Sequence, residues 1–280
     1  MTPLSSLWYD FLCPPNEQDL VSKELDIAAT TAEQAGAILL KHFGKTLNIR
    51  YKDRINLVTK ADRETEQIIV CSLLKAFPSY GILAEEGTTA VAGDTRWIVD
   101  PLDGTTNYAH GYPVFCVSIA LEREGTIRLG VIYDPTRREM FTALKGQGAY
   151  LNRTRICIST TNTIGRAILV TGFAYDVQTS RDNNLDHFAN FILKAQAVRR
   201  DGSAALDLAY LACGRFDGFW ELKLHPWDTA AGSLLVTEAG GRMSDFKGSH
   251  FSIYDQETLA SNGLVHKAMQ RILAKALPKG

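Results

Sequence analysis

The middle of the chain is the most restrictive part of the sequence, because strand-like segments follow one another there at short intervals. Residues 114–121 and 127–133 are apolar and rich in β-branched side chains, and residues 140–143 and 149–151 are shorter segments of the same kind. Glycines and Pro135 stand between these segments, as expected of turns. A chain with this block must build a sheet, and its flanking segments must supply the layers that cover it.

Helical patterns flank this block. Over residues 19–43 the apolar residues recur at steps of three and four, which predicts a long helix with one buried face. A second helix is expected before Pro78, and strand–helix pairs follow the central block up to a last helix over residues 264–276. This order fits helices and sheets packed in layers. We therefore predict an α+β protein in which residues 19–280 form a single domain, with residues 1–18 as an N-terminal extension.

Composition and charge argue against several classes of function. The formal net charge is −1, so the chain has no strong field to attract nucleic acid or an anionic membrane. No apolar run reaches the length of about 20 residues that a membrane span needs, and the N-terminal residues do not resemble a secretion signal. The five cysteines form no Cys-x-x-Cys pair, which favours reduced thiols and a cytoplasmic location. We expect neither nucleic-acid nor membrane partners.

Two apolar segments end in carboxylates. Residues 97–99 run directly into Asp100, with Asp103 three residues later, and residues 82–84 run into Glu85. Loops after strand ends are where α/β proteins hold their ligands. Two aspartates with a backbone carbonyl between them offer the oxygen ligands that Mg²⁺ prefers. The spacing therefore predicts a magnesium site.

A phosphate site is expected beside it. If Gly104 and Thr105 open a helix, their N–H groups and the helix dipole favour an anion there, and Thr106 completes a predicted phosphate-binding segment. A metal site next to a phosphate site is the outline of a phosphate-ester hydrolase.

Three blocks of sequence resemble signatures of the inositol monophosphatase family. They are W-I-V-D-P-L-D-G-T-T-N-Y at residues 97–108, L-H-P-W-D-T-A-A-G at residues 224–232 and I-L-A-E-E at residues 82–86. The blocks occur in the family's order and at roughly its spacing, and the resemblance covers about residues 19–276. It implies a five-layer αβαβα sandwich and, commonly, a homodimer.

The resemblance also implies an activity. The leading hypothesis is Mg²⁺-dependent hydrolysis of myo-inositol monophosphate, a small phosphorylated polyol, to inositol and phosphate. One alternative keeps the chemistry and changes the substrate to another small phosphate ester, such as fructose 1,6-bisphosphate or histidinol phosphate. A second alternative is a non-catalytic scaffold that keeps the fold and binds metal.

The resemblance further implies a ligand set. Glu85, Asp100 and the carbonyl of Leu102 are expected to hold one Mg²⁺ ion, and Asp100, Asp103 and Asp228 a second, with a third, looser ion near Glu85. Mn²⁺ is expected to substitute, and Li⁺ and Ca²⁺ to inhibit. Four buried acids would repel one another without such cations. Taken singly, Asp103 could be a turn residue and Asp228 a helix cap.

Thr105 is the candidate partner of the nucleophilic water. The family usually places an aspartate in a D-x-V-T stretch to orient this threonine, but Asn56 stands at the matching position. An asparagine can accept a hydrogen bond but cannot take a proton. We therefore expect no threonine–aspartate relay, and a water activation that depends more on the metals and on Glu85. Thr59 or Asp62 is interpreted as a candidate cap of the second helix.

The substrate side is implied by the resemblance alone. Gly202, Ser203, Ala204 and Glu221 are expected to line the sugar-alcohol side of the site, with Glu221 accepting hydrogen bonds from ring hydroxyls. The alternative for Glu221 is an exposed acid at a strand end. Thr106 stands where the family branch that acts on adenosine bisphosphates usually carries a lysine, which favours the inositol-type branch.

Overall fold

The structure is a computed structural model that describes residues 15–45, 50–51, 57–58, 60–87, 89–90 and 93–274. The expected N-terminal extension, residues 1–18, lies largely outside the described residues, and Asn56 lies wholly outside them. The short strands β1 (Arg50–Tyr51) and β2 (Leu57–Val58) pair with each other.

The central block of strands forms one large sheet. Its order is β10-β9-β8-β7-β6-β5-β3-β4. All described neighbours in it are antiparallel except the parallel pair β3–β5. The strands are β3 (Gly81–Ala84), β4 (Thr89–Ala90), β5 (Thr95–Asp103), β6 (Cys116–Arg123), β7 (Thr126–Asp134), β8 (Glu139–Leu144), β9 (Gly148–Leu151) and β10 (Thr154–Arg155).

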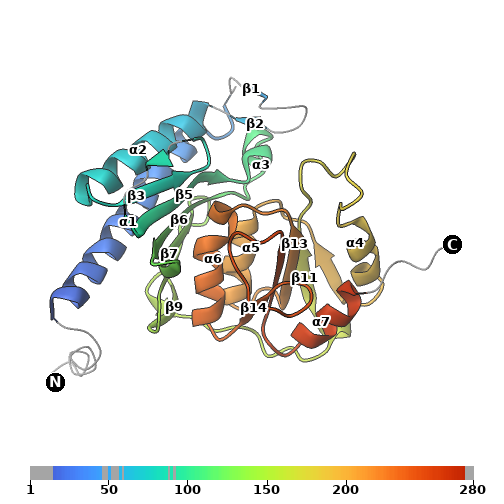
Figure 1. Ribbon diagram of the computed structural model, residues 1–280. Coiled ribbons are helices and arrows are strands. Elements are labelled where there is room, and N and C mark those ends of the chain that lie inside the picture. The colour runs from blue at the N-terminus through green and yellow to red at the C-terminus, as the bar shows by residue number, and fades with distance from the viewer. Residues whose placement is uncertain are drawn as a thin grey trace.

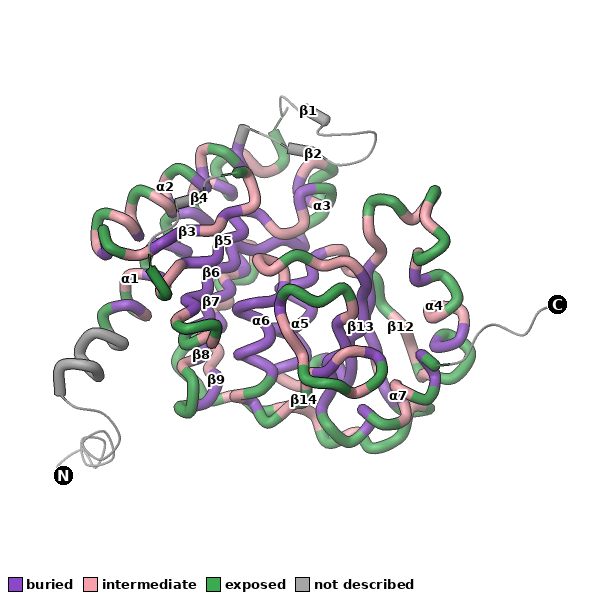
Figure 2. Tube along the Cα trace, in the orientation of Figure 1, coloured by how far each residue is buried: buried purple, intermediate pink, exposed green. Residues whose placement is uncertain are grey.

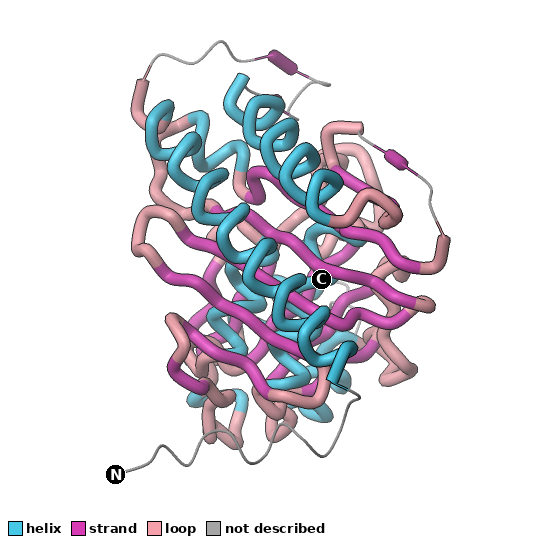
Figure 3. Tube along the Cα trace, turned by 90° about the vertical axis from the view of Figure 1, so that its left-hand side faces the viewer, coloured by secondary structure: helices cyan, strands magenta, loops and turns pink. Residues whose placement is uncertain are grey.

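Two helices cover one face of this sheet, α1 (Pro15–His42) and α2 (Lys60–Ala76), as Figure 3 shows. In α1, Ala28, Ala32, Ala35 and Leu39 are fully buried, which is the spacing of one helix face. The three alanines let α1 approach the sheet closely. Gly36 contributes to the same close contact, because a Cβ there would collide with the Tyr133 ring of β7. None of the described helices is both long enough and apolar enough to cross a membrane.

A second, five-stranded sheet has the order β12-β11-β13-β15-β14. Its strands are β11 (Ile168–Thr171), β12 (Ala197–Arg199), β13 (Gly218–Leu222), β14 (Arg242–Ser244) and β15 (Glu257–Ser261). The helices α4 (Leu185–Ile192) and α7 (His266–Leu273) pack on one face through a core that includes Phe191, Trp220 and Met269. A 3₁₀ turn, Ile164–Arg166, precedes β11.

The helices α5 (Ala204–Ala212) and α6 (Pro226–Glu238) form the layer between the two sheets and contact strands of both. They are buried along most of their length (Figure 2). A Cβ at Gly130 of β7 would lie 2.8 Å from the Ala231 carbonyl of α6, so that glycine permits the close contact. The layers therefore run α1/α2, first sheet, α5/α6, second sheet, α4/α7 (Figure 1). This order confirms the predicted αβαβα sandwich.

Strand β5 connects the fold to the acidic residues. Trp97 and Val99 belong to the core under α1 and α2, whereas Ile98 belongs to the core around α5 and α6. By the same alternation, Asp100 faces the middle layer. The pairing of β5 with β6 then shifts register between Asp100 and Asp103, around Pro101, which has no N–H to donate. A bulge of this kind re-aims side chains at the edge of a site.

A buried histidine joins the last strands to α7. His266 is fully buried, and its ring nitrogens lie 2.9 Å from Ser244 Oγ and 2.8 Å from Ser261 Oγ. Burial, followed by repulsion from Arg242, lowers the pKa of His266 to about 4. The folded protein therefore holds this imidazole neutral where an exposed histidine would already be charged.

This histidine predicts a measurable pH dependence of stability. The unfolded chain takes up a proton at His266 near pH 6.5, but the folded chain does so only near pH 4, so its contribution is complete above pH 6.5 and is lost as the pH falls toward 4. The difference in free energy of unfolding between wild type and His266→Gln should shrink by about 2 kcal/mol from pH 7.5 to pH 5. Urea unfolding of both proteins measures it, and a pH-independent difference would contradict the assignment.

Candidate active site

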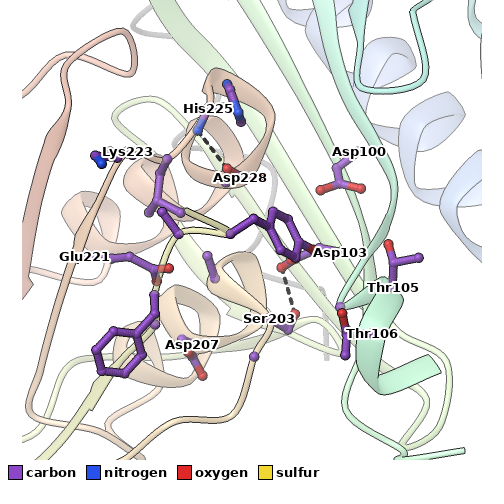
Figure 4. Close-up of a pocket in the computed structure, with 18 of the residues that line it drawn as sticks. Asp100, Asp103, Thr105, Thr106, Ser203, Asp207, Glu221, Lys223, His225 and Asp228 are labelled. Atoms are coloured by element: carbon purple, nitrogen blue, oxygen red, sulfur yellow. Dashed lines mark hydrogen bonds between the residues drawn. The ribbon is translucent and has the colours of Figure 1, made fainter. Parts of the chain in front are cut away.

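The four predicted carboxylates line one cavity of about 530 Å³. Glu85 follows β3, Asp100 and Asp103 lie at the end of β5, and Asp228 lies in the first turn of α6. Figure 4 shows Asp100, Asp103 and Asp228 around this space. Acids from the first sheet and from the helical layer beside it therefore meet at one place.

Mutual repulsion acts on these acids. Burial raises the pKa of Asp100 well above its usual range, and repulsion from Glu85, Asp103 and Asp228 adds to the effect. Burial and the charge of Asp103 likewise raise the pKa of Asp228. Divalent cations would remove this repulsion and favour the ionised carboxylates.

Asp103 also connects two elements. Its Oδ2 accepts hydrogen bonds from Ser203 Oγ and from the Ala205 N–H at the start of α5, both at 2.7 Å (Figure 4). These donors partly offset the effect of burial, which raises the pKa of Asp103. Asp103 is thus not a simple turn residue, because it ties the end of β5 to α5.

Asp228 is a helix cap as well as a lining residue. Its Oδ2 accepts a hydrogen bond from the His225 N–H at 2.7 Å, and the His225 side chain accepts from the backbone N–H of Asp228. This reciprocal pair is a capping box at the start of α6. The capping alternative considered for Asp228 is correct, and it is compatible with a place in the cavity.

The chemistry of the donor set fits a hard divalent cation, because carboxylates and the Leu102 carbonyl offer oxygen. As they stand, the described residues contain no group of three or more His, Cys, Asp or Glu side chains that could hold a metal ion. Burial, followed by the charge of Asp103, raises the pKa of the nearby Cys116 thiol well above its usual range.

The expected phosphate-binding segment opens a short helix, α3 (Thr105–Ala109). Gly104 stands at its N-cap with φ of 98°, and a Cβ there would lie 2.8 Å from the Val114 carbonyl, so only glycine fits. Gly104, Thr105 and Thr106 all line the cavity, with Thr105 buried and Thr106 exposed.

The structure corrects the expectation that Thr105 has no aspartate partner. Its hydroxyl lies 3.0 Å from the Leu102 carbonyl and 3.3 Å from Asp62 Oδ1, and it can donate to either. Asp62 lies in the first turn of α2 and is almost fully buried. An acid six residues after Asn56, at the start of a predicted helix, was the available signal. Its interpretation as a cap overlooked this contact.

The expected substrate side is also present. Gly202, Ser203, Ala204 and Glu221 all line the cavity. Glu221, at the end of β13, is buried, so the alternative of an exposed strand-end acid is wrong. Burial and the charge of Asp103 raise the pKa of Glu221 to about 8, although Arg200 opposes the shift. A second buried acid, Asp207 of α5, lines the same cavity and was not predicted; a lone acid in an apolar helix was its signal.

The chain matches known proteins in sequence and in fold. The model described as "Inositol monophosphatase family" matches residues 21–279. An inositol-1-monophosphatase of Synechocystis sp. is 45% identical over 89% of this chain and 88% of that protein. The Nus factor SuhB of Pseudomonas aeruginosa is 42% identical over 91% of this chain and 97% of that protein. The solved inositol monophosphatase from Anabaena (Nostoc) sp. superposes with a TM-score of 0.85 at 42% identity, over 93% of this chain and 98% of that chain.

Proposed function

The chain belongs to the inositol monophosphatase family and is a phosphatase, and we propose that it hydrolyses myo-inositol monophosphate to inositol and phosphate. One observation carries the proposal: four acids, a buried threonine and a buried glutamate line a single cavity. The acids suit cations, the threonine suits a water, and the glutamate suits the hydroxyls of a polyol.

We assign the cation ligands as Glu85, Asp100, the Leu102 carbonyl, Asp103 and Asp228, and we propose Mg²⁺ as the ion, with two or three per site. When bound, such ions lower the pKa of a water and stabilise a leaving oxygen. Mn²⁺ is expected to substitute, and Li⁺ and Ca²⁺ to inhibit. The ability of the chain to hold several cations rests on the excess of negative charge in the cavity.

The chain's own groups orient the reactants. The N–H groups of Gly104, Thr105 and Thr106, at the start of α3, bind the phosphoryl oxygens. The hydroxyl of Thr105 accepts a hydrogen bond from the attacking water while it donates to Asp62 or to the Leu102 carbonyl. When the hydroxyl donates to Asp62, this carboxylate orients it and offers a place for a proton.

Asp62 is therefore expected to be important for turnover. Asparagine keeps the shape and the hydrogen bond from Thr105 but cannot take a proton. We expect Asp62→Asn to lower kcat about a hundredfold with little change in KM, at the low end of general-base effects. Phosphate release at saturating substrate measures it. Glu64→Gln, two residues away on the same helix, is the control, and an unchanged kcat in Asp62→Asn would refute the role.

The substrate assignment is tested with a panel of phosphate esters at equal concentration and with released phosphate as the readout. Inositol 1-phosphate should have the highest kcat/KM, because the buried Glu221 can accept hydrogen bonds from several ring hydroxyls. Fructose 1,6-bisphosphate and histidinol phosphate represent the alternative of another small ester. If inositol 1-phosphate is the poorest substrate, the proposed substrate is wrong.

We also propose that residues 19–280 act as one domain, that the protein forms a homodimer and that it works in the cytoplasm without nucleic-acid partners. The absence of phosphate release from any ester on the panel, with Mg²⁺ bound, would favour the alternative of a non-catalytic metal-binding scaffold. Size-exclusion chromatography with light scattering tests the dimer.

A further inference from the structure

Asp207 lies in the middle of a helix that is otherwise apolar apart from one tyrosine. The helix α5 has the sequence A-A-L-D-L-A-Y-L-A, and all of its residues are buried. Asp207 is 1% exposed, and its Oδ1 has no hydrogen-bond partner among the described residues. Leaving a buried polar atom unpaired costs roughly 1–3 kcal/mol. A requirement other than folding must therefore favour an acid at this position.

Asp207 lies on the face of α5 that borders the cavity, as its distance of four residues from Ser203 indicates. Residues four apart share one face of a helix, and Ser203, four residues earlier, donates its hydroxyl hydrogen bond to Asp103. Asp207 lines the same cavity. Figure 4 shows it on the side that holds Glu221, away from Asp100 and Thr105. Asp207 thus lies at the end of the cavity opposite the proposed reacting centre.

This end of the cavity is acidic and closely packed. Asp201, Glu221 and Asp103 repel the charged form of Asp207, and Arg200 is the cation that attracts it. The carboxylate of Glu221 packs against the backbone at Gly172, where a Cβ would overlap with it. Two carboxyl groups are therefore held at one end of the cavity, and Oδ1 of Asp207 lacks a hydrogen-bond partner among the described residues.

We propose that Asp207 is a further specificity-determining residue, which hydrogen-bonds one hydroxyl group of the polyol at a position beyond Glu221. This inference rests on the function proposed above. A hydroxyl both donates and accepts, so it can supply the missing partner of Asp207, whereas a methylene leaves the carboxyl buried and unpaired. Sites built to pair a hydroxyl discriminate strongly against analogues that lack it.

The test is a cycle of substrate and enzyme variants. Inositol 1-phosphate and its monodeoxy analogues are assayed with wild type, Asp207→Asn and Asp207→Ala, so that the result does not depend on one variant folding. In the wild type, removal of one particular hydroxyl should raise KM at least about tenfold. In Asp207→Ala the intact substrate should show a similar rise, and removal of the same hydroxyl should have little further effect. Asp207→Asn still offers an accepting oxygen, so its rise in KM should be smaller. Asp201→Asn, whose side chain does not line the cavity, is the matched control.

Thermal unfolding of the ligand-free proteins supplies a second readout. Replacing an unpaired buried carboxyl should leave the melting temperature of Asp207→Asn unchanged or raise it, whereas a structural role would lower it. If removal of the hydroxyl raises KM by the same factor in the wild type and in both variants, the inference is overturned and the proposed function remains intact. A wild type that releases no phosphate from inositol 1-phosphate would overturn both.

Discussion

Asp103→Asn is expected to lower kcat/KM for inositol 1-phosphate by about a thousandfold or more, a loss of about 4 kcal/mol of transition-state stabilisation. The asparagine keeps a carbonyl oxygen for Ser203 and for the Ala205 N–H, so the connection between β5 and α5 survives. What disappears is one negative charge of the proposed cation site. Phosphate release measures turnover, and a Mg²⁺ titration followed by thermal shift measures cation affinity separately.

Asp217 provides a matched control for this substitution. Like Asp103, it is largely buried and accepts hydrogen bonds from one serine hydroxyl, that of Ser159, and one backbone N–H, that of Ile168. It does not line the cavity. Asp217 accepts through both of its oxygens, so in Asp217→Asn an amide NH2 group faces one of the two donors. This variant should therefore lose at least as much stability as Asp103→Asn, while kcat/KM stays within about threefold. If Asp103→Asn retains full turnover, the assignment of Asp103 as a cation ligand is wrong.

Glu85→Gln is expected to lower kcat/KM at least about a hundredfold, whereas Glu86→Gln should change it less than about threefold. The two acids are adjacent, but only Glu85 lines the cavity. The backbone N–H of Glu86 instead donates to Glu66 of α2 at 2.8 Å. Steady-state kinetics of both variants at several Mg²⁺ concentrations makes the comparison.

Higher Mg²⁺ should partly restore Glu85→Gln, because a weakened site fills at higher ion concentration. It should have no such effect on Glu86→Gln. Equal losses in the two variants would mean that the turn after β3 matters as a whole, and the specific role of Glu85 would be refuted.

The layered fold could be predicted because its strongest signals are local. The step of three and four in α1 and the β-branched runs of β6 and β7 follow directly from periodicity. The last strand, β15, was missed because Thr258 and Ser261 give it a polar sequence, although both side chains are buried in the structure. These two polar side chains are buried because β15 pairs with β13 and β14 inside the second sheet. That pairing cannot be predicted from a single sequence.

In the candidate site, too, features with a local sequence signal could be predicted, whereas contacts between distant segments could not. Acids that end apolar strands were predictable, because a carboxylate there has few structural uses. The contact between Asp62 and Thr105 joins residues 43 positions apart, and it follows from how α2 packs beside α3. Asp207 could not be predicted, because the small and apolar residues around it in the sequence indicate a buried packing helix rather than a site residue.

The helical layer between the two sheets has a consequence for biosynthesis. Asp100 and Asp103 are translated in the first half of the chain, whereas Glu221 and Asp228 come late and reach the cavity only when α6 inserts beside β7. No nascent fragment that stops before α6 carries the full set of acids. Under the proposed function, a growing chain that lacks α6 therefore has an incomplete cation site, and interrupted synthesis yields inactive products.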